Sequence, residues 1–202
     1  PDPMGMDIVI PTVTPAAITR NVARGNDADQ GGGGLYATPS GVIQVFEALI
    51  ESNVANGTSG SGGGIFSAGD LLAQGTSIRR NRANRAGGGI EDAGGTVSLT
   101  DVRLDKNWIQ DGAPGNGGGL HSGGGDVTIT RGIIADNMAV EGGGLWTNGT
   151  LTINGGADGD NDDDDDAEDG DRSFFTVLSG NEASGDEAGI GGGGLYVETG
   201  GM

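Results

Sequence analysis

The chain has 202 residues, of which 45 are glycine and only 4% are aromatic, a composition that suits either disorder or a repeat architecture with many tight corners. Its net charge of −19, from 29 acidic and 10 basic residues, would repel a phosphate backbone, so no nucleic-acid partner is expected. The glycines do not recur at every third position, which excludes collagen, and no apolar run approaches the roughly 20 residues of a membrane span, so no membrane insertion is expected.

The first elements predicted along the chain form one repeat unit. Residues 8–13, IVIPTV, have the composition of a short strand. An aliphatic-x-x-Asn-x-Ala signature follows at residues 18–23, and a glycine run that closes on leucine follows at residues 31–35. Residues 43–45, Ile-x-Val, alternate again as a strand does. Each unit is therefore expected to hold three short strands separated by turns, and no segment has the length of a helix.

Both signatures recur along the whole chain. The glycine run is closed six times by an aliphatic residue, at spacings of 30, 25, 30, 25 and 50 residues. The closing residues are Leu35, Ile65, Ile90, Leu120, Leu145 and Leu195. The second signature also occurs six times, with its asparagines at Asn21, Asn53, Asn81, Asn107, Asn137 and Asn181. Six matches at linked positions indicate a repeat protein rather than a disordered chain.

The repeat predicts an all-β fold, a right-handed parallel β-helix of about six coils of 25–30 residues, as a single domain over residues 1–202. The closing aliphatic residues should point inward and stack, and the glycines should allow close backbone approach. The asparagines should adopt left-handed turns and form an internal hydrogen-bonded ladder. Both ends of the chain fall at the same point of the repeat without a visible cap, so we expect uncapped ends that continue into further coils or a further copy.

The two signatures resemble repeats of chlamydial polymorphic outer membrane proteins, whose passenger β-helices carry GGA-aliphatic and Phe-x-x-Asn motifs. This chain has GGG-aliphatic and Ile/Leu-x-x-Asn in the same alternating order, from about Ile8 to Gly200. It is thus similar to the broader class of bacterial and archaeal surface β-helix repeat proteins. The resemblance implies an extracellular or cell-surface location and a structural or adhesive role.

The last repeat carries an acidic insertion at residues 155–174, which contains the run NDDDDDAEDGD. Alternating aspartates in this loop have the spacing of a calcium loop of the EF-hand or dockerin type. The candidate metal ligands are Asp158, Asp160, Asp162, Asp164, Asp166 and Asp169. The alternative is a solvated acidic loop that holds cations diffusely. Calcium is the only cofactor that the sequence suggests.

The residue after each closing aliphatic should face solvent, because side chains alternate along a strand. These positions form a column at Tyr36, Phe66, Glu91, His121, Trp146 and Tyr196. Its five rings, all but Glu91, suit carbohydrate stacking, and the alternative is that they simply shield the sheet. We refer to these six positions as the aromatic column.

No catalytic site is predicted. The best group of charged residues is Asp101 and Asp105 on the strand that carries Arg103 and Lys106, and alternating charges of this kind are common on outward faces. The sequence therefore predicts a non-enzymatic structural or adhesive surface protein. It would be a subunit of a head-to-tail filament or a segment of a longer β-helix. The alternative is a β-helix that binds or degrades polysaccharides.

Overall fold

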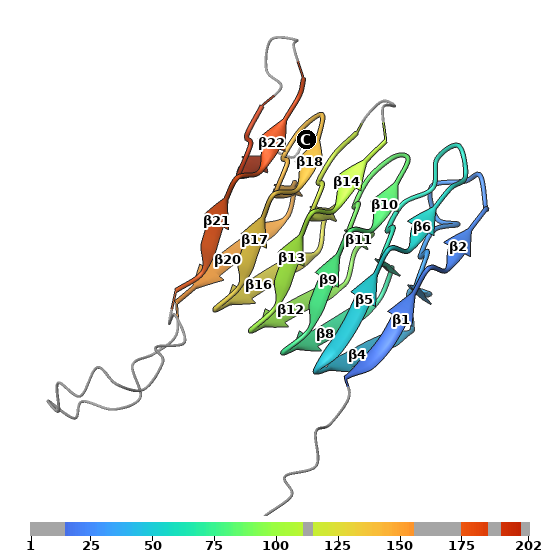
Figure 1. Ribbon diagram of the computed structural model, residues 1–202, viewed down its shortest axis with the longest axis horizontal. Coiled ribbons are helices and arrows are strands. Elements are labelled where there is room, and N and C mark those ends of the chain that lie inside the picture. Colours follow the sequence, from blue (N-terminus) through green and yellow to red (C-terminus); the bar gives the residue numbers. More distant parts are fainter. Residues whose placement is uncertain (1–14, 111–114, 156–174, 186–190, 199–202) are drawn as a thin grey trace, which may run out of the picture.

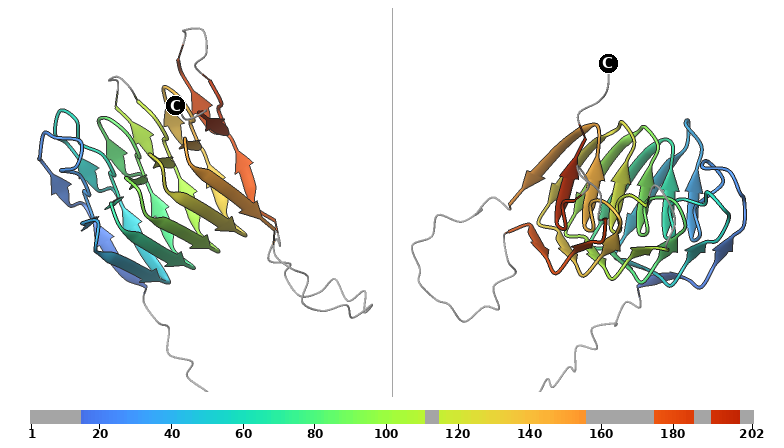
Figure 2. Two further views of the ribbon diagram at one scale, coloured as in Figure 1. Left: turned by 180° about the vertical axis from the view of Figure 1, so that it is seen from behind. Right: turned by 90° about the horizontal axis from the view of Figure 1, so that it is seen from above.

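The computed structural model describes residues 15–110, 115–155, 175–185 and 191–198, and shows a parallel β-solenoid (Figure 1). The described strands pair only in parallel and build four sheets, with six, six, six and five strands. Figure 2 shows the coils stacked side by side along one axis. The all-β parallel solenoid expected from the repeat is therefore confirmed. The described residues contain no helix that is long and apolar enough to cross a membrane.

Within each sheet, neighbouring strands come from successive coils. Sheet A contains β1 (Ala16–Thr19), β5 (Ala48–Glu51), β9 (Ser77–Arg79), β13 (Arg103–Asp105), β17 (Ile133–Ala135) and β21 (Val177–Ser179). Sheet B contains β2 (Val22–Ala23), β6 (Val54–Ala55), β10 (Arg82–Ala83), β14 (Trp108–Ile109), β18 (Met138–Ala139) and β22 (Glu182–Ala183). Sheet C contains β3 (Leu35–Ala37), β7 (Ile65–Ser67), β11 (Ile90–Asp92), β15 (Leu120–Ser122), β19 (Leu145–Thr147) and β23 (Leu195–Val197). Sheet D contains β4 (Val42–Phe46), β8 (Asp70–Gln74), β12 (Thr96–Thr100), β16 (Asp126–Thr130) and β20 (Thr150–Asn154).

The core consists of columns of aliphatic side chains, one from each coil. The residues that close the glycine runs pair in register, as Ile90 does with Ile65 on one side and Leu120 on the other. These three side chains are at most 1% exposed. Burying an aliphatic side chain of this size stabilises the fold by about 1.5–3 kcal/mol. The inward orientation expected for the closing aliphatics is thus confirmed, and it explains why the coils stack.

The asparagines of the second signature form a continuous ladder inside the solenoid. The side-chain amide of Asn81 donates to Oδ1 of Asn107 at 3.0 Å, and the amide of Asn107 donates to Oδ1 of Asn137 at 3.1 Å. Each Oδ1 also accepts the backbone N–H of the asparagine in the preceding coil, for example from Asn107 to Asn137 at 2.9 Å. The ladder therefore fixes the register between coils with buried hydrogen bonds.

Two details of this segment differ from expectation. Positive φ occurs at the residue before each described asparagine, for example 53° at both Arg80 and Lys106, and not at the asparagine itself. This bend divides the aliphatic-x-x-Asn-x-Ala segment into two strands, so each coil has four short strands instead of three. The reason is that the asparagine side chain must point inward to join the ladder, so the residue before it takes the left-handed turn.

The glycine runs allow the backbones of neighbouring coils to approach closely. A Cβ added at Gly88 would lie 2.5 Å from the carbonyl oxygen of Gly118 and 2.7 Å from the backbone of Trp108, which no side chain can tolerate. Gly87 before it adopts a φ of +61°. The expected role of the glycines is thus confirmed at this corner, and it is architectural.

Candidate functional site

The aromatic column is mostly covered, so its predicted exposure is wrong for four of the six positions. Phe66, Glu91, His121 and Trp146 are 1–6% exposed, whereas Tyr36 at one end of the column is 47% exposed. The rings stack on each other across coils, with centroids 4.3 Å apart for His121 and Trp146. The segment before each glycine run adds contacts, because Nε1 of Trp146 donates to Oε2 of Glu141 at 3.1 Å. The column therefore shields sheet C and offers no continuous surface for carbohydrate.

Within the column, Glu91 and His121 form a buried polar contact that the sequence did not reveal. Nδ1 of His121 lies 2.9 Å from Oε2 of Glu91, an ion-pair distance without hydrogen-bond alignment. Nη2 of Arg85 donates to the other carboxylate oxygen at 2.9 Å. His121 and Glu91 are 30 residues apart but adjacent in register. Each residue directly follows a closing aliphatic in the repeat, and this shared position could have predicted that they are neighbours.

The group around Asp101 and Asp105 is divided between two sets of ion pairs. Asp101 binds both Nε and Nη2 of Arg131 in the next coil, at 2.7 and 2.8 Å. Asp105 is 5% exposed and accepts from Arg103 at 3.0 Å, with Lys106 at 3.6 Å. Each carboxylate is thus matched to its own basic partner. This arrangement suits a stable outer face better than a pair of acids acting on one substrate.

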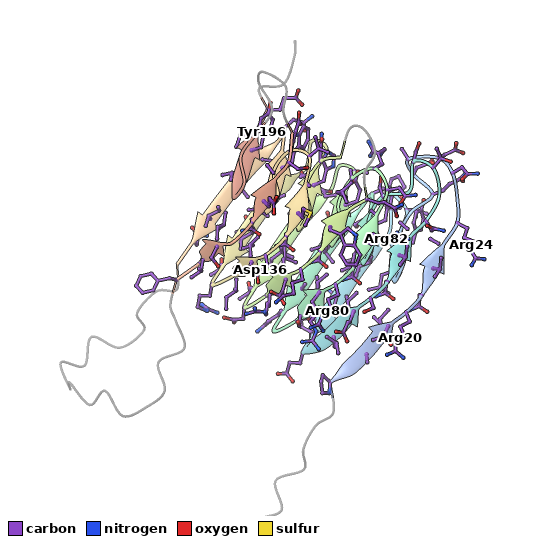
Figure 3. The ribbon with its side chains drawn as sticks, turned by 45° about the horizontal axis from the view of Figure 1, so that its top comes forward. Arg20, Arg24, Arg80, Arg82, Asp136 and Tyr196 are labelled. Carbon is purple, nitrogen blue, oxygen red and sulfur yellow. The ribbon has the colours of Figure 1, made fainter. Side chains whose placement is uncertain are left out.

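An open groove with a mainly apolar lining follows the bend between sheets A and B. It has a volume of about 820 Å³, and we call it the Trp108 groove. Its floor is lined by Val54, Trp108 and Met138, and its rim by Ser52, Arg80, Lys106 and Asp136. Trp108 is 38% exposed and Met138 is 46% exposed. In Figure 3, Arg20, Arg80 and Asp136 follow one line across the stacked coils, and Arg82 lies beside that line. The groove runs along the stack, since its residues come from four consecutive coils.

Ion pairs order the rim of the groove. Oε1 of Glu51 lies 2.7 Å from Nη1 of Arg80 and 3.0 Å from Nε of Arg79. The hydrogen bond from Arg80, and then the charge of Arg79, hold the pKa of the Glu51 carboxyl below its ordinary value, although partial burial opposes this. Lys106 lies 3.4 Å from Asp136 in the next coil. The rim therefore presents charged groups that are already positioned.

The remaining predicted site residues fall outside the described part of the chain. These are the candidate calcium ligands Asp158, Asp160, Asp162, Asp164, Asp166 and Asp169, within the undescribed range 156–174. Among the described residues, no group of three or more His, Asp or Glu side chains is arranged to hold a metal ion. Comparisons with protein-family models, curated protein sequences and solved structures gave no match to this chain.

Proposed function

We propose that this chain is a structural module of an extracellular or cell-surface protein, in which the coils of one copy stack head-to-tail on those of another. The observation that supports this is the exposure of core positions in the outermost described coils. Ile153 on β20 is 39% exposed, whereas its register partner Ile129 is 1% exposed. Leu195 on β23 is 36% exposed, whereas its partner Leu145 is 1% exposed.

Core positions are also incompletely buried at the opposite end of the stack. The outermost described strands there are β1 to β4, where the core residues Ile18, Leu35 and Ile43 are only partly buried. Their register partners Ile50, Ile65 and Leu71 in the next coil are at most 1% exposed. A parallel strand with a free edge pairs readily with another strand of matching register. Contacts of this kind between identical copies are heterologous and do not close, so they generate a filament. A continued β-helix would bury these residues as the interior coils bury theirs. The resemblance of the repeats to surface passenger proteins supports the location and an adhesive role.

The experiment that tests this proposal is electron microscopy of the purified protein, together with sedimentation over a range of concentrations. We expect filaments, and we expect Ile153→Lys to abolish them by placing a charge in the junction between copies. Thr152→Lys is the matched control, because its side chain alternates to the other face of the same strand. Particles that remain monomeric at every concentration would overturn the proposal.

The acidic insertion is proposed to bind calcium through the alternating aspartates at residues 158–169. The support is their spacing, which matches the ligand positions of a calcium loop. Calorimetric titration should show saturable calcium binding, weakened by Asp160→Asn combined with Asp162→Asn. An equal response to magnesium or sodium would contradict an ordered site. We expect the solenoid to remain folded without calcium, because the core of the described coils is built from residues outside this loop.

A polysaccharide-degrading enzyme remains the alternative function. Two observations count against it, because most of the aromatic column is covered and Asp101 and Asp105 each have their own basic partner. A lyase and hydrolase screen on acidic polysaccharides decides it. Turnover that disappears in Asp101→Ala or Asp105→Ala would favour the enzyme over the structural module.

A further inference from the structure

The Trp108 groove combines an apolar floor with charged groups along one line. Each coil contributes one or more residues to it, from Ser52 on one side to Asp136 and Met138 on the other. Neighbouring coils are about 4.8 Å apart. Equivalent residues therefore recur along the groove at nearly the spacing of successive sugars in an extended polysaccharide. A linear molecule lying parallel to the solenoid axis would contact several coils at once.

The rim residues occupy backbone positions that ordinarily favour glycine. Ser52, Arg80, Lys106 and Asp136 have φ values of 53–58°, in the left-handed region. Such a conformation is unfavourable for a residue that carries a Cβ. Gly180 holds the equivalent place in the following coil with a φ of 61°, so glycine is compatible with this turn. The ladder requires this turn in each described coil, and the four residues that occupy it here all line the groove.

The surroundings of the groove are more basic than the chain as a whole. Five of the ten basic residues of the chain lie on β9, β10 and β13 or directly after β9 and β13, at Arg79, Arg80, Arg82, Arg103 and Lys106. Three carboxylates pair with members of this group, at Glu51, Asp105 and Asp136. Glu182, the register partner of Met138 on sheet B, adds a fourth carboxylate, so one positive charge remains locally in a chain whose net charge is −19. The groove is thus complementary to an anion that the rest of the surface repels.

Trp108 adds a partly exposed aromatic ring to the groove. Its register neighbours on sheet B are Arg82 and Met138, so the indole lies between a cation and an apolar side chain. Nη2 of Arg82 is held by Oδ1 of Asn56 at 3.1 Å. A partly exposed indole has one apolar surface and one polar edge, which suits the apolar face of a pyranose ring.

We propose that the Trp108 groove binds an extended anionic polysaccharide along the solenoid axis. Trp108 stacks against one sugar ring, and Arg80 and Lys106 contact carboxylate or sulfate groups on neighbouring sugars. The proposal does not depend on head-to-tail assembly, because none of these side chains belongs to the exposed core of the outermost described coils. An adhesive surface module would use such a groove to hold a matrix polymer.

The test is isothermal titration of the full chain with four probes. Polygalacturonate and alginate carry carboxylates, heparin carries sulfates, and dextran is neutral. We expect binding of at least one anionic polymer, and weaker binding at higher salt. Dextran should not bind measurably. Comparison of the carboxylated and sulfated polymers identifies which anion the groove prefers.

Variants connect the binding to the groove. Trp108→Ala should weaken affinity at least tenfold, and the double change Arg80→Gln with Lys106→Gln should do the same. Arg131→Gln is the matched control for charge, since Arg131 also has a positive φ of 52° and does not line the groove. Tyr36→Ala is the control for an exposed ring. Both controls should keep wild-type affinity within twofold, and so should Ile153→Lys, which separates this proposal from assembly.

Several results would overturn the proposal. They are no binding of any anionic polymer, equal binding of dextran, or unchanged affinity in both groove variants. Self-association that Trp108→Ala abolishes would show instead that a second copy occupies the groove. If Trp108→Ala loses its thermal transition, the double Arg80 and Lys106 variant decides the question, because both side chains are about half exposed.

Discussion

Substitution of Asn107 by alanine should cost a large part of the stability of the solenoid. The side chain is fully buried, and its Oδ1 accepts from both the backbone N–H and the amide of Asn81 at 3.0 Å. Its own amide donates to the carbonyl of Ile78 at 2.8 Å and to Asn137 at 3.1 Å. Alanine would leave two buried donors of Asn81 without this acceptor. At about 1–3 kcal/mol for each unsatisfied group, we expect a loss of roughly 4 kcal/mol.

The matched control is Asn21→Ala at the first described position of the ladder. Asn21 is exposed, and its amide makes one ladder bond, to Oδ1 of Asn53 at 3.0 Å. The backbone N–H of residue 21 would still donate to the same oxygen, as it does now at 2.9 Å. We therefore expect a loss of about 0.5–1 kcal/mol.

Urea unfolding followed by far-ultraviolet circular dichroism measures both variants. The difference between them is the informative quantity, since the chemical change is identical and only the place in the ladder differs. Equal losses in the two variants, or a loss below about 1 kcal/mol for Asn107→Ala, would refute the view that the ladder stabilises through buried hydrogen bonds.

Three further predictions concern the corners and the charged groups. Gly88→Ala should lower the free energy of unfolding by roughly 3 kcal/mol or more, because the new Cβ would lie 2.5 Å from backbone atoms. Gly75→Ala should lower it by only about 1 kcal/mol, because its φ of +59° is unfavourable for alanine but the nearest contact is 3.4 Å away. Thermal unfolding of both variants compares them. Glu91→Ala should cost about 3 kcal/mol in urea unfolding by leaving partners of a buried carboxylate unpaired, and a loss near zero would show that water replaces it. Because the pKa of Glu51 is lowered in the folded protein, its ion pairs contribute fully to stability at pH values above the ordinary pKa of a glutamate. This contribution is lost as the pH falls through the lower pKa of the folded state. Arg80→Gln should therefore reduce the fall in urea midpoint on acidification, and an unchanged pH profile would contradict this.

The architecture could be predicted from local features that repeat. Each closing aliphatic, each glycine run and each asparagine has the same neighbours in every interior coil, so one periodic pattern implies one stacked environment. The inward position of Ile90 and the ladder role of Asn107 follow from this. The metal-binding prediction for the acidic insertion could not be judged in the same way, because those residues lie outside the described part of the chain.

The sequence by itself determined which residues stack, because hydrophobic burial and backbone hydrogen bonding act at every repeat in the same way. Only the tertiary structure decided what the outer faces do. Alternation placed Trp146 outside sheet C, but contacts with His121 and Glu141 cover it. Trp108 carried no signal in the sequence, yet the left-handed turns before the asparagines leave its ring over an open groove. The exposure of an outward side chain depends on contacts with segments about one coil away. The repeat period identifies which residues are neighbours in the stack, but it does not show whether the segments between them cover those residues.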